Sequence, residues 1–318
     1  MSRLASRLAL LALILVTAPS AGADAPATGQ GRGLRFWTAF AKDCAVPPGE
    51  TAFGLVRESL SFLGLPDVAW RDEVSYGVLA SCAYEKRALE PAQRRALVAE
   101  LVPNLRRGIG ESGNDGVLLR SFSALDLSIL AAAENRDPAL DAAGYRALLD
   151  AAFAYLWDER DLRGLEPRVG WIHATAHTAD LLKFLARDSR FTPADQRRLL
   201  EGAWSKLTAP GTPVFTHAED ERLAAAIASV VRRADFAATP FEAWLAQFAP
   251  LEKQVWSQAP PDARKLDAAQ NARNLLRALF VALSLPAPAA PGAQPAPAGP
   301  SVAAAREKVL DTLRVIRR

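Results

Sequence analysis

Apolar residues recur at helical spacing along most of this 318-residue chain, with short breaks between the runs. No stretch alternates apolar and polar residues for long enough to indicate a half-buried strand. Half of the residues are hydrophobic, and the richness in Ala and Leu also favours helices. We predict helices over residues 34–42, 50–63, 68–87, 91–109, 116–134, 142–157, 169–186, 193–207, 218–233, 240–258 and 262–283.

These segments predict an all-α fold. About eleven helices with short connections favour an array of antiparallel helical hairpins, curved like an α/α superhelix or a HEAT-like solenoid. A compact multi-helix globule is the alternative. One internal likeness supports stacked hairpins, because Thr192-Pro193 and Glu90-Pro91 both place a proline at the first position of a predicted helix.

The start of the chain has the pattern of a targeting segment. We interpret residues 1–23 as a signal peptide, because Arg3 and Arg7 precede an apolar run over 8–16 and a small-residue cleavage site. This predicts a periplasmic or secreted protein. An uncleaved membrane anchor is the alternative, although the run is too short for a spanning helix. Residues 24–33 are polar and Gly-rich, and we expect them to be a disordered N-terminal segment.

The rest of the chain divides into three predicted parts. The helical domain covers residues 34–285, and a Pro/Ala linker follows over 286–300, because prolines prevent a helix there. Residues 301–318 form a short amphipathic basic helix in this prediction, and we expect it to dock on the helical domain. A membrane-surface or partner-binding helix is the alternative, but the apolar face is narrow. That face consists of Val302, Val309, Leu313 and Ile316.

The charge of the chain gives little reason to expect a nucleic-acid partner. The full chain has 38 basic and 35 acidic residues, and loss of Arg3 and Arg7 with the signal peptide brings the two nearly into balance. Nucleic-acid binding depends on a strongly basic surface, so we expect none.

Cys44 and Cys82 are the only two cysteines. In an oxidising compartment they can pair, and closing a loop of roughly 40 residues would stabilise the fold by about 4 kcal/mol in the chain-entropy model. Two buried thiols that act as small apolar groups are the alternative. The sequence leaves both readings open, because a disulfide needs Cα atoms within about 7 Å.

Histidine is rare here and is concentrated in two segments. The chain has three histidines, of which His173 and His177 lie one helical turn apart and Asp180 follows at the next turn. This spacing places the three side chains in one stripe of a helix. Two imidazoles at that spacing can bind a divalent metal such as zinc, with Asp180 as a third ligand or as a hydrogen-bond acceptor. His217, which precedes another predicted helix, is the candidate fourth ligand.

Other side chains in these segments are candidates for the border of the same site. Trp171 and Glu219 lie next to the histidines in sequence, and Asp180 and Asp220 are the candidate catalytic carboxylates. Acids in the first turn of a helix also complement its dipole, which would be a purely structural role. The histidines likewise could be satisfied polar residues on a buried helix.

The segment 158–164 alternates charges, so Asp161 and Arg163 either pair with each other or border the site. Arg120 lies on an apolar helix and is expected to pair with an acid such as Asp126 or with a partner helix. Ser121 is not in a Gly-x-Ser-x-Gly sequence, so a serine nucleophile elbow is not supported.

Several of these segments together resemble an uncharacterised bacterial family, domain of unknown function 2785. The similar segments are RSFSAL (120–125), ERDLRG (159–164), GWIHATAHTADLL (170–182) and EDERLA (219–224). The resemblance covers roughly residues 90–285 and implies a helical-repeat-like fold, but it supplies no activity. It implies one shared site formed by Trp171, His173, His177, Asp180 and Asp220.

Two functions are compatible with the sequence. The first is an exported helical protein with a His/Asp site that binds a metal and supports metal-assisted hydrolysis. The alternative is a non-enzymatic helical scaffold that binds a protein or peptide in its groove, with structural histidines. The first requires the histidines and Asp180 to converge in an open pocket, whereas the second allows them to be dispersed or buried.

Overall fold

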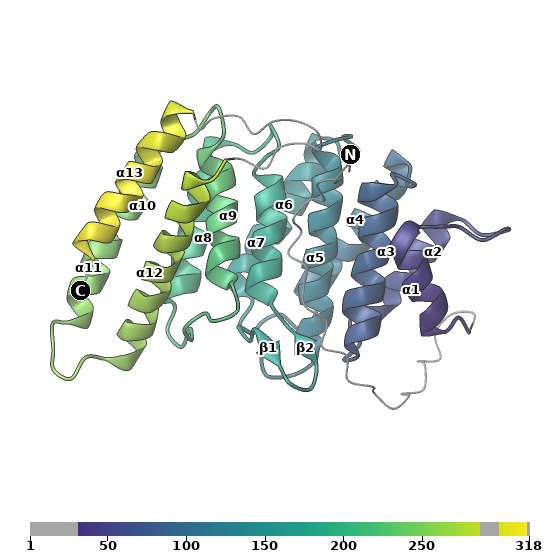
Figure 1. The fold of residues 1–318 in the computed structure, drawn as a ribbon, viewed down its shortest axis with the longest axis horizontal. Coiled ribbons are helices and arrows are strands. Elements are labelled where there is room, and N and C mark those ends of the chain that lie inside the picture. Colours follow the sequence, from purple (N-terminus) through teal and green to yellow (C-terminus); the bar gives the residue numbers. More distant parts are fainter. Residues whose placement is uncertain (1–30, 287–298, 317–318) are drawn as a thin grey trace, which may run out of the picture.

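The computed structural model of the chain describes residues 31–286 and 299–316. The predicted signal peptide, residues 24–30 of the N-terminal segment and residues 287–298 of the linker lie outside the described residues. The described part is all-α apart from one small hairpin, as predicted (Figure 1). Its longer helices are α1 (Leu34–Asp43), α2 (Ala52–Ser59), α4 (Pro91–Leu101), α5 (Gly116–Glu134), α6 (Ala142–Asp158), α7 (Ala174–Leu185), α8 (Pro193–Thr208), α9 (Glu219–Val231), α10 (Ala238–Leu245), α11 (Phe248–Val255), α12 (Ala263–Ser284) and α13 (Pro300–Val315).

Helices α5, α7, α9 and α12 lie side by side and form one layer, which we call the inner layer (Figure 1). Helices α4, α6 and α8 pack against it as a second layer. The inner helices begin at the same edge of the molecule. At that edge Asp115, before α5, pairs with Arg168 of the connection into α7, and His173, at the start of α7, lies beside Glu219 at the start of α9.

Helix α5 is the central element of the core. All but a few of its residues are buried, and it contacts both α4 and α7. Among the described helices, α5 is long and apolar enough to cross a membrane by length and composition, but 83% of that stretch is buried inside the protein. Its apolar character is therefore explained by packing in the core of a helical domain.

The N-terminal end of the domain is closed by a disulfide. Cys44, at the end of α1, is bonded to Cys82, and their Cα atoms are 5.2 Å apart. Cys82 lies in η3 (Ala80–Glu85), the second of two π-helical stretches; the first is η2 (Ala69–Tyr76), and the short α3 (Gly77–Leu79) separates them. The open question of the two cysteines is thus resolved in favour of the pair.

Local rules explain many of the helix boundaries. Thr192 begins α8 with a reciprocal cap, in which its hydroxyl accepts from the Asp195 amide at 3.3 Å and the Asp195 carboxylate accepts from the Thr192 amide at 2.9 Å. The start of α4 is similar, because the Gln93 side chain accepts from the Glu90 amide at 2.9 Å. Both predicted proline-led starts are confirmed.

Several predicted helices differ from the observed elements, and two of them, 50–63 and 91–109, end in the short 3-10 helices η1 (Leu60–Phe62) and η4 (Val102–Arg106). Residues 68–87 contain π-helical turns, which apolar spacing over so short a stretch does not distinguish from α-helix. Residues 240–258 are divided between α10 and α11. The predicted helix 169–186 begins only at Ala174, because the residues before it belong to a small antiparallel hairpin of β1 (Leu165–Glu166) and β2 (Gly170–Trp171).

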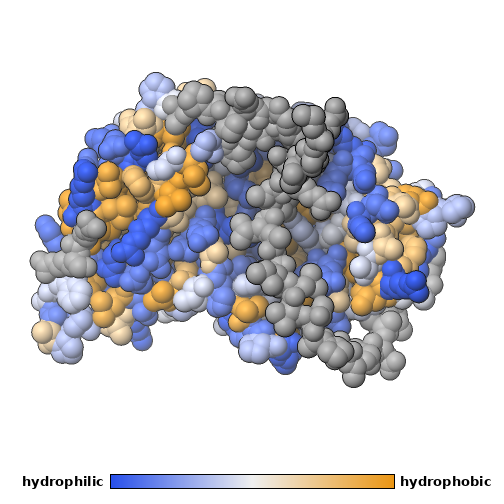
Figure 2. Space-filling view, viewed as in Figure 1, coloured by the Kyte–Doolittle hydropathy of each residue, from blue (hydrophilic) through white to orange (hydrophobic). Residues whose placement is uncertain are grey.

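The C-terminal helix α13 packs back on the domain, against α12 and α10. Val302, Val309 and Ile316 are buried in the core and Leu313 packs partly against it, which is the docking arrangement expected from their common face. Figure 2 shows apolar side chains gathered near the seam of α12 and α13, with hydrophilic side chains on α12 beside them. The apolar face of α13 is therefore largely used within the chain itself.

Candidate functional site

An unusual backbone conformation marks the starts of α7 and α9. Both helices follow a non-glycine residue in the left-handed backbone region, His173 with φ 52° and Ala218 with φ 67°. This conformation is uncommon for residues with a side chain, and it is retained where the surroundings enforce it, often at functional sites. Its consequence here is that two segments turn sharply at one edge and bring their side chains together.

Three aromatic rings meet at this edge. The Trp171 indole stacks on the His173 imidazole with centroids 4.5 Å apart and an angle of 21° between the planes. The His217 ring meets the Trp171 indole edge-on, with centroids 5.8 Å apart. Trp171 and His217 are half-buried and His173 is buried, so the indole and the second imidazole can be reached from solvent.

A buried carboxylate lies beneath these rings. Glu219 is 2% exposed; its Oε2 accepts from the backbone amide of His217 at 2.9 Å, and its Oε1 lies 3.8 Å from His173 Nε2. His173 Nε2 also lies 2.6 Å from the carbonyl oxygen of His217. Since a carbonyl only accepts, Nε2 carries the proton of that imidazole. Burial lowers the pKa of His173, so the neutral ring with this tautomer is favoured.

Gly164 allows the rings and the carboxylate to approach the backbone. A Cβ atom at this position would lie 2.7 Å from Glu219 Oε1 and closer still to the His217 ring. Any other residue would force both side chains to move. We call the group formed by Gly164, Trp171, His173, His217 and Glu219 the α7–α9 edge site.

His177 lies one turn further into α7 and is sealed from solvent. Ser121 donates its hydroxyl proton to the carbonyl oxygen of Ile172, so the contact of 2.8 Å between Ser121 Oγ and His177 Nδ1 requires the imidazole to donate. The ring also packs edge-on against Phe122 at 4.9 Å. Burial and the neighbouring His173 lower the pKa of His177 to about 3, and it is therefore neutral at physiological pH.

Asp180 faces two cations instead of the histidines. Its Oδ1 accepts from Lys183 Nζ at 2.6 Å, and its Oδ2 pairs with the Arg222 guanidinium. Burial alone would raise the pKa of Asp180, but Lys183 and Arg222 outweigh it and hold the pKa below its ordinary value. The carboxylate is thus ionised and already neutralised.

These contacts correct the predicted zinc site of His173, His177, Asp180 and His217. Within residues 31–286 and 299–316, no group of three or more His, Cys, Asp or Glu side chains is arranged to hold a metal ion. The physical reason is that His173 lies at the N-cap instead of on the helical stripe, its Nε2 is protonated, and Asp180 is engaged by cations. The structure brings together His173, His217, Trp171 and Glu219. The His177 ring meets the His173 ring edge-on, with centroids 5.6 Å apart, but its Nδ1 bonds Ser121 in the core, and Asp180 faces cations.

The remaining candidates lie around the site. Asp220 is turned toward α12, where it lines a cavity of about 530 Å³ with Arg277 and Val281. Burial raises the pKa of Asp220. Asp161 and Arg163 pair with each other at 2.6 Å, and Asp161 also accepts from the Gly113 amide at 2.9 Å. Their role is to hold two loops together at the border of the site.

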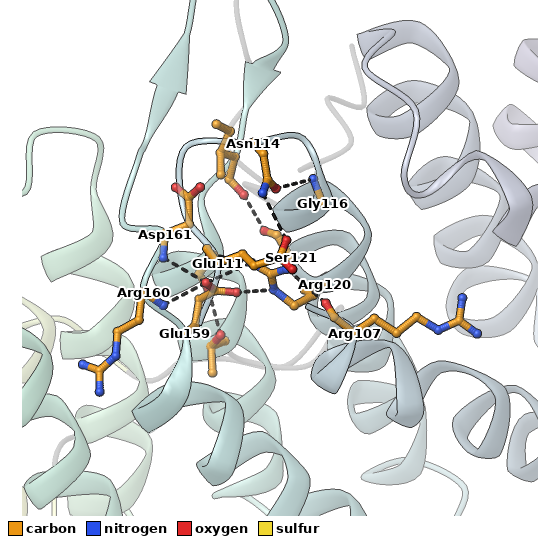
Figure 3. A network of polar contacts seen from close by, with 12 residues as sticks. Arg107, Glu111, Asn114, Gly116, Arg120, Ser121, Glu159, Arg160 and Asp161 are labelled. Carbon is orange, nitrogen blue, oxygen red and sulfur yellow. Dashed lines mark hydrogen bonds and ion pairs between the residues drawn. The ribbon is translucent and has the colours of Figure 1, made fainter. Parts of the chain in front are cut away.

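A buried ion pair anchors these loops from below (Figure 3). Arg120 donates to both carboxylate oxygens of Glu159, at 2.6 and 3.1 Å, and Glu159 also accepts from the amides of Arg160 and Asp161. Both side chains are at most 2% exposed. Arg120 therefore pairs with Glu159 at the end of the neighbouring helix α6, which is the second of the two expected partners, and not with Asp126. Breaking such a pair by removing one partner is strongly destabilising.

Sequence reasoning missed Gly164 and Glu159 as determinants of the site. One signal was available for each residue, since Gly164 ends the charged segment 158–164 and Glu159 lies within it. Neither signal identifies the partner, because Arg120 and His217 are distant along the chain.

The family described as Protein of unknown function (DUF2785) matches residues 105–281, a stretch that contains the whole α7–α9 edge site and the Arg120–Glu159 pair. No curated protein and no solved structure matches the chain. The matched stretch is more than half of the sequence, so the chain belongs to the DUF2785 family.

Proposed function

We propose that this protein binds a small polar ligand at the α7–α9 edge site and exchanges a proton with it through His217. The observation that carries the proposal is the convergence of Trp171, His173 and His217 over the buried carboxylate of Glu219. A glycine at position 164 makes this convergence possible. Such a group of polar side chains beside an aromatic face is typical of a ligand site.

Each residue has a distinct role in this proposal. The accessible indole of Trp171 provides a flat apolar surface on which a ligand can stack. His217 is the half-buried imidazole, and imidazole is the side chain best suited to general acid–base chemistry near neutral pH. Glu219 accepts from the backbone of His217 and so fixes the position of that ring. His173 acts as a positioning residue, because its Nε2–H holds the His217 carbonyl.

This proposal replaces metal-assisted hydrolysis with acid–base chemistry. The reason is the engagement of the donor atoms that a metal would need, namely His173 Nε2 and the Asp180 carboxylate. Two further parts of the proposal concern the molecule as a whole: that it is exported, and that the hairpins continue as a curved superhelix. The Cys44–Cys82 disulfide supports export, because such bonds persist in oxidising compartments.

The proposal is tested by screening small polar ligands for a rise in Tm and for a change in tryptophan fluorescence. A ligand that acts on the wild-type protein is expected to lose its effect in Trp171→Ala and in His217→Ala. Trp256→Ala is the matched control, since Trp256 is 47% exposed on another element. Binding that persists unchanged in both site variants, while the control also binds, would overturn the proposal.

A further inference from the structure

Five basic side chains cross the inner layer near the ends of its helices. They come from the segment after α5, from the last turn of α7 and the residues beyond it, and from both ends of α9. We call this group the cationic belt: Arg136, Lys183, Arg187, Arg222 and Arg232.

The belt is continuous from helix to helix. Lys183 and Arg222 share the carboxylate of Asp180, which joins α7 to α9. Arg187 Nε donates to Ser229 Oγ at 3.3 Å, which joins the same two helices further along. The Asn135 side-chain Nδ2 donates to the Phe184 carbonyl at 2.8 Å, so the end of α5, beside Arg136, meets the end of α7.

Aromatic rings support the cations. The Arg136 guanidinium lies 4.4 Å from the centre of the Tyr84 ring, and Lys183 and Arg187 lie 4.6 and 4.9 Å from the Phe184 ring. Contacts of this kind hold a cation in place without neutralising its charge. Arg136 and Arg187 are exposed, and the Arg222 side chain is 41% exposed. Arg136, Arg187 and Arg222 therefore present charge to solvent, whereas Lys183 and Arg232 are half-buried, and Arg232 donates to the carbonyl of Ala282 at 2.6 Å.

The charge of the belt is not balanced within the chain. Asp180 is the single carboxylate bonded to it among the described residues. Nearby acids are already engaged by other arginines, since Asp188 pairs with Arg190 and Asp235 with Arg233. Packing around its guanidinium and the like charge of Arg232 lower the pKa of Arg187, although part of this side chain is exposed. Arg187 and Arg232 thus repel each other, and no carboxylate forms an ion pair with either of them among the described residues.

Helix dipoles explain only part of this arrangement. Lys183, Arg187 and Arg232 lie near helix C-termini, where positive charge is favourable. Arg222 lies in the first turn of α9, where the dipole disfavours a cation. Stabilisation of helix C-termini therefore does not explain why Arg222 belongs to the belt.

The spacing of the cations suits an extended peptide. Lys183 lies in the last turn of α7 and Arg187 two residues after its end, and both cations contact the Phe184 ring, so the two positions are about one helical turn, roughly 6 Å, apart. In an extended chain, side chains on the same face repeat at about 6.7 Å. We propose that the cationic belt binds an acidic peptide segment in an extended conformation, with carboxylates at alternate residues. This inference is independent of the ligand proposed for the α7–α9 edge site.

The test uses fluorescence anisotropy with a labelled peptide in which Glu and Ser alternate. We expect binding by the full chain that weakens steeply as salt is added, because exposed charges are screened. The variant Arg187→Ala/Arg232→Ala should lose affinity by at least about tenfold, the loss of roughly one good ionic contact. The control Arg35→Ala/Arg264→Ala removes the same charge at two exposed positions outside the belt and should bind as the wild type does.

Other probes separate the alternatives. The same peptide with Gln in place of Glu should not bind, and Trp171→Ala should bind the acidic peptide normally even if the edge site fails. Equal binding of the Gln peptide, or equal loss in the control variant, would overturn the proposal. Binding of oligogalacturonate without binding of the Glu peptide would overturn it in favour of an acidic polysaccharide.

Discussion

Asp126 has an ionisable side chain but lies buried in the core of the protein. It is fully buried in α5, and neither carboxylate oxygen has a hydrogen-bond partner among the described residues. Burial raises the pKa of Asp126 well above its ordinary value, so the native protein holds this side chain in its neutral form. An unfolded chain would release the proton near pH 4.

This difference predicts a pH-dependent stability. Above about pH 4 the native state binds one more proton than the unfolded state, so unfolding becomes easier as pH rises, by about 1.4 kcal/mol per pH unit. The slope continues until the native carboxyl itself ionises. Asp126→Asn has no such proton and should lose this slope, whereas Asp43→Asn, at an exposed carboxyl, should keep it. Urea unfolding at several pH values measures this; parallel pH profiles for wild type and Asp126→Asn would contradict it.

Gly164 offers a direct test of the packing at the edge site. Gly164→Ala should displace His217 and Glu219, with a loss of about 1–3 kcal/mol in unfolding free energy. The imidazole NMR signals of His217 should shift as well. Gly33→Ala is the control, because nothing lies within 4 Å of a Cβ at that position and φ is −77°. Equal stability of the two variants would mean that the site does not need a glycine.

At the scale of single residues, the sequence identified the segments that form the site but not which side chains bond to each other. The rarity of histidine directed attention to residues 170–182 and 217–222, and Trp171, His173, His217 and Glu219 do meet there. His173 and His177 do lie side by side, with ring centroids 5.6 Å apart, but His173 is a left-handed residue before α7 and its Nε2 donates to the His217 carbonyl. Asp180 was assigned to the histidines because the sequence does not show that Arg222 reaches it from α9.

At the scale of elements, periodicity predicted the helices better than their ends. The bounds of α5 agree with the prediction because Gly and Asp precede it and its apolar spacing is unbroken. The hairpin of β1 and β2 was missed, since each strand has only two residues and no alternation can appear in them. The π-helical turns were missed for a similar reason.

The disulfide is the element-scale feature with the clearest energetic consequence. It closes a loop with a sequence separation of 38 residues, and Cys44→Ala/Cys82→Ala should lower the unfolding free energy by about 4 kcal/mol in the chain-entropy model. A reductant should destabilise the wild type by a similar amount and leave the variant unchanged. Guanidinium unfolding with and without reductant measures both effects. A wild type that is indifferent to reductant would show that the loop is already held by packing.

At the scale of the whole molecule, composition predicted the all-α fold and the docking of the last helix. Both follow from the distribution of apolar residues, which are the residues that the layers bury. The order of the layers did not follow from composition. It depends on long-range contacts such as the Arg71 side chain donating to the carbonyl of Val169 at 2.6 Å.

A prediction for the whole molecule is that it is exported from the cytoplasm. The basic start, apolar run and small-residue site predict cleavage before Asp24, so the mature protein should begin at that residue. N-terminal sequencing of protein recovered from the producing cell measures this, and fractionation should place it outside the cytoplasm. A cytoplasmic chain that begins at Met1 would refute the prediction.

The Cys44–Cys82 disulfide and the α7–α9 edge site occupy separate stretches of the sequence. The disulfide joins residues 44 and 82, whereas the family match begins at 105 and the site lies between Gly164 and Glu219. The loop that the disulfide closes nevertheless reaches the site, because Arg71 lies within it and donates to the carbonyls of Val169 and Trp171 at 2.6 and 3.3 Å. Loss of both cysteines therefore loosens the segment that holds Trp171, so a change outside the family match acts on the position of a site residue as well as on stability.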